Sequence, residues 1–167
     1  MLERLLPGAS HLQNPHPLVV HFPIAFLYGA TLLYFIAWAL RRDSLAWTAM
    51  WLLVLGVLGA AAAVATGLYG AEGVMIAPSV RENLLEPHEE LMLVTSGVAL
   101  ALSVWAVVAR PMPLRGRYLF LLALVVMAAM LTKGADYGGR MVFDYNAAGG
   151  ACSQPIPFVN NSPAFGP

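Results

Sequence analysis

Charged residues are scarce in this 167-residue chain. They make up 11% of the residues, against about 25% in an ordinary soluble domain, while 59% are hydrophobic and the mean hydropathy is +0.70. The formal net charge is zero, so no basic field favours nucleic acid as a partner. This composition argues against a soluble domain and predicts an integral membrane protein made of one helical bundle.

Cysteine is nearly absent as well, because Cys152 is the only one. One cysteine cannot form an internal disulfide, and the lack of CxxC and CxxCH motifs argues against a thiolate zinc site and a covalently attached c-type haem. The sequence also contains no hydrolase triad pattern, no phosphate-binding loop and no inverted repeat of the kind found in transporters. Redox and assembly functions remain open.

Four hydrophobic segments are long enough to cross a bilayer. They are expected at residues 17–40, 45–69, 90–109 and 118–131, with the last extending to about residue 136. Each approaches the ~20 residues with which a helix crosses about 30 Å of hydrocarbon. We therefore predict an all-α integral membrane four-helix bundle over residues 16–145. A periplasmic segment, 1–15, precedes it, and an extended periplasmic C-terminal tail, 146–167, follows it.

Proline and glycine predict the ends of two of these helices. Pro87 suits the first turn of a helix, so the third helix is expected to begin there. Gly138 and Gly139 are expected to end the fourth helix. Pro23 falls inside the first helix and removes a backbone hydrogen bond, which predicts a kink or a broken first turn near His21.

Arginines gather in two short connections between the helices. The first connection holds Arg41 and Arg42, and the last holds Arg110, Arg115 and Arg117. Together they contain five of the nine basic residues and one of the nine acidic residues, Asp43. The positive-inside rule places both connections in the cytoplasm. This predicts a multi-pass protein of the bacterial inner (cytoplasmic) membrane with both termini periplasmic.

The four histidines then lie on the outer side of the membrane: His11, His16 and His21 near the first helix, and His88 near the third. His16 and His21 are about 140° apart on an ideal helix, so they make a poor chelating pair. A pair between His21 and His88 is easier, because it joins two helices. Imidazole is a common axial haem ligand. We therefore predict that His21 and His88 ligate the iron of haem b, with His16 as the reserve ligand.

Structural roles are open for the same histidines. His16 could serve as a helix N-cap, and His21 could hydrogen-bond a carbonyl released by Pro23. His88, beside Glu89, could be part of a solvated helix start at the membrane interface.

Three carboxylates are candidate proton acceptors if quinol is oxidised at this end: Glu89, Glu90 and Asp136. Asp136 is equally well placed to pair with Lys133 at i, i+3. Such boundary charges are costly enough in a membrane protein to be candidates for function.

Small residues recur at every fourth position of the second helix, as Gly59, Ala63 and Gly67. This spacing lets another helix, or a flat cofactor, approach closely. Helix packing is the reading that we favour.

The last 22 residues are rich in proline, glycine, alanine and asparagine and have no helical period. Four large apolar residues interrupt them: Ile156, Phe158, Val159 and Phe165. Such a segment is either disordered or docked on a partner. We favour docking on a periplasmic protein, such as a cytochrome or a membrane enzyme complex.

Two motifs carry a family resemblance. HPLVVHFPIAFLYGA, at residues 16–30, resembles the opening signature of the small bacterial membrane family catalogued as domain of unknown function 2231. YGGRMVFDYNAAG, at residues 137–149, resembles its closing signature, except that Asn-Ala-Ala replaces the more usual Gly-Val ending. The resemblance covers roughly residues 14–150 and matches His88 to a histidine that opens the third helix. It implies a four-helix membrane protein, often found beside redox proteins, with haem binding or electron-transfer support as the suggested role.

Two function classes follow. We favour a membrane-embedded redox subunit that binds haem b, or quinol, at the periplasmic end and exchanges electrons with a periplasmic partner, rather than a stand-alone enzyme. The alternative is a non-catalytic anchor or assembly subunit of a larger membrane complex, with structural histidines. A haem absorption band in the purified protein separates the two.

Overall fold

The computed structural model describes residues 15–73, 76–145 and 147, and this part of the chain contains helices and no strands. The helical elements are α2 (His16–Val19), α3 (His21–Leu40), α4 (Asp43–Ala71), α5 (Pro78–Val80), the π-helical turn η2 (Arg81–Leu85), α6 (Glu86–Ala109) and α7 (Arg117–Phe143). They form four rods that are long and apolar enough to cross a membrane: His16–Leu40, Asp43–Ala71, Pro78–Ala109 and Arg117–Phe143. The expected all-α membrane bundle is confirmed.

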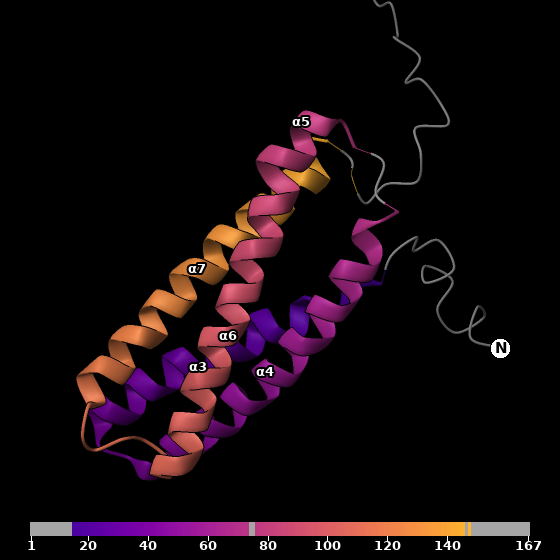
Figure 1. The fold of residues 1–167 in the computed structure, drawn as a ribbon. Helices are drawn as coiled ribbons and strands as arrows, with labels where there is room; N and C mark the ends of the chain where they lie inside the picture. Colours follow the sequence, from indigo (N-terminus) through magenta and orange to yellow (C-terminus); the bar gives the residue numbers. More distant parts are fainter. Residues whose placement is uncertain (1–14, 74–75, 146, 148–167) are drawn as a thin grey trace, which may run out of the picture.

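The four rods run alternately up and down (Figure 1). Helix α3 packs on α4 and α7, and α6 packs on the same two helices, so α3 and α6 lie on a diagonal of the bundle. The α3–α4 and α6–α7 connections lie at one end, which we call the arginine end because it carries Arg41, Arg42, Arg110, Arg115 and Arg117. The opposite end, with His16 and His88, is called the histidine end.

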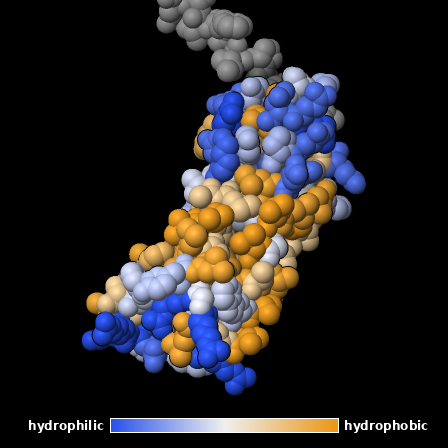
Figure 2. All heavy atoms as spheres, turned by 60° about the vertical axis from the view of Figure 1, so that its left-hand side comes forward, coloured by the Kyte–Doolittle hydropathy of each residue, from blue (hydrophilic) through white to orange (hydrophobic). Residues whose placement is uncertain are grey.

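The surface matches a bilayer environment. Figure 2 shows an apolar belt between two hydrophilic ends. Each rod exposes a leucine along its length: Leu32, Leu58, Leu100 and Leu122 are 61%, 62%, 53% and 60% exposed. In water such a belt would be costly, whereas in hydrocarbon it is the matching surface.

The core of the arginine end is tightly packed with aromatic rings. Tyr34 and Phe120 are fully buried and meet edge to face with their centroids 5.0 Å apart, and Trp105 meets Phe120 at 5.6 Å. Tyr34 donates its hydroxyl hydrogen bond to the Pro111 carbonyl at 3.1 Å, so its polar end is satisfied. Edge-to-face pairs of this kind add to the stabilisation from burial alone.

The first helix is interrupted as Pro23 predicts. Helix α2 ends at Val19, Val20 forms a turn, and α3 begins at His21. Pro23 has no N–H to donate to the Val19 carbonyl, which weakens the ladder at this point. Helix α4 approaches closely here, since a Cβ on Gly59 would lie 3.1 Å from Pro23 Cδ. Gly59, the first of the small residues spaced by four on α4, therefore serves helix packing, as expected.

The expected start of the third helix at Pro87 is confirmed for α6, which begins at Glu86 and has Pro87 in its first turn. That the rod as a whole begins there is wrong, because α5 and the π-helical turn extend it back to Pro78. Inside an α-helix, proline clashes with the carbonyl four residues earlier. Here the π-helical turn Arg81–Leu85 comes directly before α6 and widens the backbone ahead of Pro87.

The expected end of the fourth helix at Gly138 and Gly139 is also wrong, since α7 continues to Phe143. Transmembrane helices tolerate interior glycine more often than soluble helices do. Gly138 has a packing reason as well, because a Cβ there would lie 3.3 Å from Cε1 of the His88 ring.

Candidate functional site

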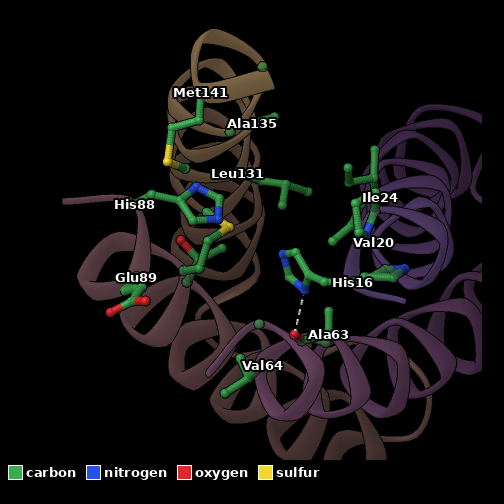
Figure 3. A pocket seen from close by; sticks show the side chains of 18 of the residues that line it. His16, Val20, Ile24, Ala63, Val64, His88, Glu89, Leu131, Ala135 and Met141 are labelled. Atoms are coloured by element: carbon green, nitrogen blue, oxygen red, sulfur yellow. Dashed lines mark hydrogen bonds between the residues drawn. The ribbon is translucent and has the colours of Figure 1, made fainter. Parts of the chain in front are cut away.

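A pocket of about 370 Å³ opens at the histidine end, between the four rods. Most of its walls are apolar. All four rods contribute to the lining: Val20, Ile24 and Leu27 from the first rod; Ala60, Ala63, Val64 and Gly67 from α4; Met92 and Leu93 from α6; and Leu131, Ala135, Gly138 and Met141 from α7. Two imidazoles, from His16 and His88, project into the same space from different rods (Figure 3). Concave apolar sites with a few convergent polar groups are typical of ligand pockets.

His16 reaches the pocket from α2 and is half-buried. Its Nδ1 lies 2.8 Å from the Ala63 carbonyl oxygen on α4, with Thr66 Oγ1 at 3.3 Å. A carbonyl only accepts hydrogen bonds, so Nδ1 carries the proton and Nε2 of the neutral ring carries the lone pair. Helix α2 has no side-chain cap hydrogen bond, so His16 ties α2 to α4 rather than capping its own helix.

His88 reaches the pocket from the first turns of α6 and is also half-buried. Its Nδ1 lies 2.8 Å from the Gly134 carbonyl oxygen on α7. By the same reasoning, Nδ1 donates, and in the neutral form of the ring Nε2 carries the lone pair. Metal-binding histidines usually have this arrangement, in which a backbone carbonyl orients the ring through the other nitrogen.

The spacing of the two rings can be compared with that of imidazoles on one metal ion. Their centroids are 6.4 Å apart and their planes differ by 86°. With metal–nitrogen bonds of about 2 Å, each centroid lies about 3.2 Å from the metal, so opposite ligands are ~6.4 Å apart and tetrahedral neighbours ~5 Å. The observed spacing fits opposite coordination positions.

His21 does not pair with His88, so the expected geometry is corrected to His16 and His88. His21 is exposed at the rim of the pocket, and its Nδ1 makes a long contact of 3.4 Å with the Leu18 carbonyl. The five-residue offset turns His21 away from the face on which His16 meets α4. The Leu18 carbonyl lies in the interrupted turn, but it is not the carbonyl that Pro23 releases. The missing N–H of Pro23 leaves the Val19 carbonyl without its helical partner.

The three candidate proton acceptors occupy different places. Glu89 is half-buried and lines the pocket beside His88, whereas Glu90 is exposed. Asp136 lies outside the lining and pairs with Lys133 Nζ at 3.4 Å, as the i, i+3 spacing predicts. Lys133 also lies over the Tyr137 ring, 4.5 Å from its centroid. Of the three, only Glu89 lines the pocket.

Two methionines and two glycines of the site were missed from the sequence. Met92 and Met141 line the pocket beside the imidazoles, and methionine in an apolar helix gives no signal of its own. The glycines did give one: Gly134 and Gly138 repeat on α7 the four-residue spacing of Ala63 and Gly67 on α4. Because Gly138 was expected to end the helix, this spacing was not recognised as a signal.

Some predicted elements lie outside the described residues. These are His11 and the four apolar residues of the tail, Ile156, Phe158, Val159 and Phe165. Within residues 15–73, 76–145 and 147, no group of three or more His, Cys, Asp and Glu side chains is placed to hold a metal ion. A metal at the pocket would therefore draw on the two imidazoles and on donors of another kind.

Comparison with known proteins gives a family and no named relative. No curated protein and no solved structure matches the chain. The model of the DUF2231 family, described as a predicted membrane protein, matches residues 13–149, which span both signature motifs and the whole four-helix bundle. The chain belongs to the DUF2231 family of predicted membrane proteins.

Proposed function

We propose that this protein is a membrane electron-transfer subunit that holds haem b between His16 and His88. The observation that carries the proposal is the imidazole pair. Two rings from different rods face one apolar pocket at 6.4 Å, and both present Nε2 because both Nδ1 atoms are hydrogen-bonded to backbone carbonyls.

The pocket suits haem for two reasons. The porphyrin brings four nitrogens of its own, so the protein needs to supply only the two axial ligands. The walls are mostly apolar and include small residues such as Ala60, Ala63 and Ala135, which suit the apolar faces of a porphyrin. Cofactor sites in four-helix bundles are commonly built this way, from side chains on facing helices.

The contribution of the chain is to position the ligands and to exclude water. Bound haem would supply reversible one-electron transfer. The carbonyls of Ala63 and Gly134 orient the rings of His16 and His88. His16 and His88 would both hold the haem iron, and iron held by two histidines would favour electron transfer over oxygen chemistry.

The orientation in the membrane is part of the same proposal. The arginine loops favour a cytoplasmic arginine end, so the pocket lies at the periplasmic end of a bacterial inner membrane protein. Electrons would then be exchanged with a periplasmic or membrane-bound partner, and the tail 146–167 is the candidate docking segment. A fluorescent protein fused after Pro167 tests this, because green fluorescent protein exported unfolded stays dark; a bright fusion contradicts the orientation.

A soft metal ion is the second candidate, and it rests on a separate observation. The thioethers of Met92 and Met141 line the same pocket as the two imidazoles. Thioether ligands select Cu(I). Copper would use one or both methionines as further ligands, whereas haem needs neither.

Spectroscopy of the purified protein tests the proposal. Protein produced with added haem should show a Soret band, and pyridine haemochrome analysis should report about one haem b per chain. His16→Ala and His88→Ala should each reduce haem content at least tenfold, while His21→Ala, the matched control at the rim, should retain it. Metal analysis of the same samples detects copper. Wild-type protein without haem would overturn the proposal and favour copper or the anchor function, according to its metal content.

A further inference from the structure

The two imidazoles are held by the same local construction. His16, at the start of the first rod, donates to the carbonyl of Ala63 on α4, and Gly67 follows four residues later. His88, near the start of α6, donates to the carbonyl of Gly134 on α7, and Gly138 follows four residues later. In both pairs the histidine-bearing rod begins at the histidine end, and the helix that supplies the carbonyl ends there (Figure 1). The site therefore consists of two half-sites that resemble each other in contact chemistry.

Each glycine lies directly against its ring. A Cβ on Gly67 would lie 3.0 Å from Cε1 and 3.1 Å from Nδ1 of His16. A Cβ on Gly138 would lie 3.3 Å from Cε1 of His88. Both distances are below ordinary van der Waals contact, so an added methyl group must move the ring.

Helix geometry explains why the glycine comes four residues after the carbonyl. The carbonyl of residue i points toward residue i+4, and the side chain of residue i+4 leans back over that turn. A side chain at i+4 therefore narrows the access to the carbonyl from that side. With glycine at 67 and 138, the carbonyls of Ala63 and Gly134 stay open to the imidazole N–H. The Ala63 carbonyl also accepts from Thr66 Oγ1 at 3.1 Å.

We propose that Gly67 and Gly138 are positioning residues, each of which holds one imidazole in the Nδ1–H tautomer and directs its Nε2 into the pocket. The repeated unit of a histidine, a small residue and a glycine four positions later then presents equivalent ligands to the two faces of one cofactor. This inference rests on the proposed function for what the imidazoles bind. The contacts between the glycines and the rings do not depend on haem.

Three substitutions separate positioning from helix stability. Gly67→Ala and Gly138→Ala should displace the rings, and Gly97→Ala on α6 is the control, because a Cβ at Gly97 meets nothing within 4 Å. All three changes raise helix propensity by the same amount, so weaker binding in the first two cannot come from a weaker helix. Loss of an outer-shell partner typically lowers affinity about 10–100-fold, and a haem titration should show that loss in Gly67→Ala and Gly138→Ala but not in Gly97→Ala.

A second readout works without haem. Nitrogen-15 NMR of the histidine rings in the haem-free protein distinguishes Nδ1–H from Nε2–H, with resonances assigned through His16→Gln and His88→Gln. Both wild-type rings should be Nδ1–H tautomers, and Gly67→Ala and Gly138→Ala should each disturb the tautomer of the adjacent ring only. If wild type binds no haem but shows this pattern, the proposed function fails and the positioning role stands. If both alanine variants keep wild-type tautomers and wild-type haem affinity, the positioning role is wrong.

Discussion

The two ends of this bundle are built differently from the same four helices. At the arginine end, Tyr34, Trp105 and Phe120 interlock and fill the core. At the histidine end, the rods leave a pocket of about 370 Å³ that is lined by small and aliphatic residues and by two imidazoles. Large rings close one end and small residues keep the other open. The comparison shows that the size of the core side chains decides whether the four helices pack closely or leave a pocket between them.

Filling the open end should give the largest effect. Ala60 is buried at 7% exposure and lines the pocket, so Ala60→Phe places a ring where the proposed cofactor lies. We expect haem content to fall at least tenfold, because the ring occupies the space of the macrocycle. Absorbance per chain measures this. Ala25→Phe, at an exposed position of α3, is the matched control and should retain haem. Full haem content in Ala60→Phe would show that the ligand lies elsewhere.

Opening the closed end should reduce stability and spare the site. Phe120 is fully buried against Tyr34 and Trp105, and Phe120→Ala removes both ring contacts. Large-to-small changes of this kind cost about 3–5 kcal/mol, so the midpoint of detergent-induced unfolding should fall markedly. Haem content of the folded fraction should stay within about twofold of wild type. A loss of haem equal to that in Ala60→Phe would mean that the two ends are not separate.

A smaller change at the closed end isolates its polar contact. Tyr34→Phe removes the hydrogen bond to the Pro111 carbonyl and leaves the ring in place. The expected loss is about 0.5–1.5 kcal/mol of unfolding free energy, because a net hydrogen bond contributes that much. The same unfolding assay measures it. A loss as large as that of Phe120→Ala would indicate that the loop between α6 and α7, and not ring packing, stabilises this end.

The smallest effect is expected at the surface of the open end. Asp136 and Lys133 form an ion pair with side chains 51% and 56% exposed, and Asp136 does not line the pocket. Asp136→Asn should change stability by no more than about 0.5 kcal/mol, as exposed pairs usually do. Haem content and reduction potential should be unchanged. A clear shift in potential would restore Asp136 as a proton acceptor of the site.

Much of the fold was predictable because hydropathy and helix length act locally. The four spans and the interruption near His21 follow from apolar runs and from the missing N–H of Pro23. The start at Pro78 and the continuation past Gly138 did not follow. The first depends on a π-helical turn before Pro87, within the same rod, and the second goes with a contact between helices, the His88 ring against Gly138.

The site was predictable in place but not in pairing. Topology brings the histidines to one end, and His88 has the expected position. The choice between His16 and His21 depends on how α2 lies against α4, where Gly59 lets Pro23 approach and His16 reaches the Ala63 carbonyl. A single sequence does not determine how α2 and α4 are aligned against each other. The repeat of a small residue and a glycine four positions later on α4 and α7 was visible in the sequence, but the histidine that meets it on α4 is known only from the structure.

The central claim is that His16 and His88 hold one haem on its two faces. The most direct measurement is the electron paramagnetic resonance spectrum of the oxidised, haem-loaded wild-type protein. Two imidazole ligands should give a low-spin ferric signal, and their interplanar angle of 86° should make it the highly anisotropic type that nearly perpendicular imidazoles produce. A high-spin ferric signal, which requires a missing or weak axial ligand, would contradict the account.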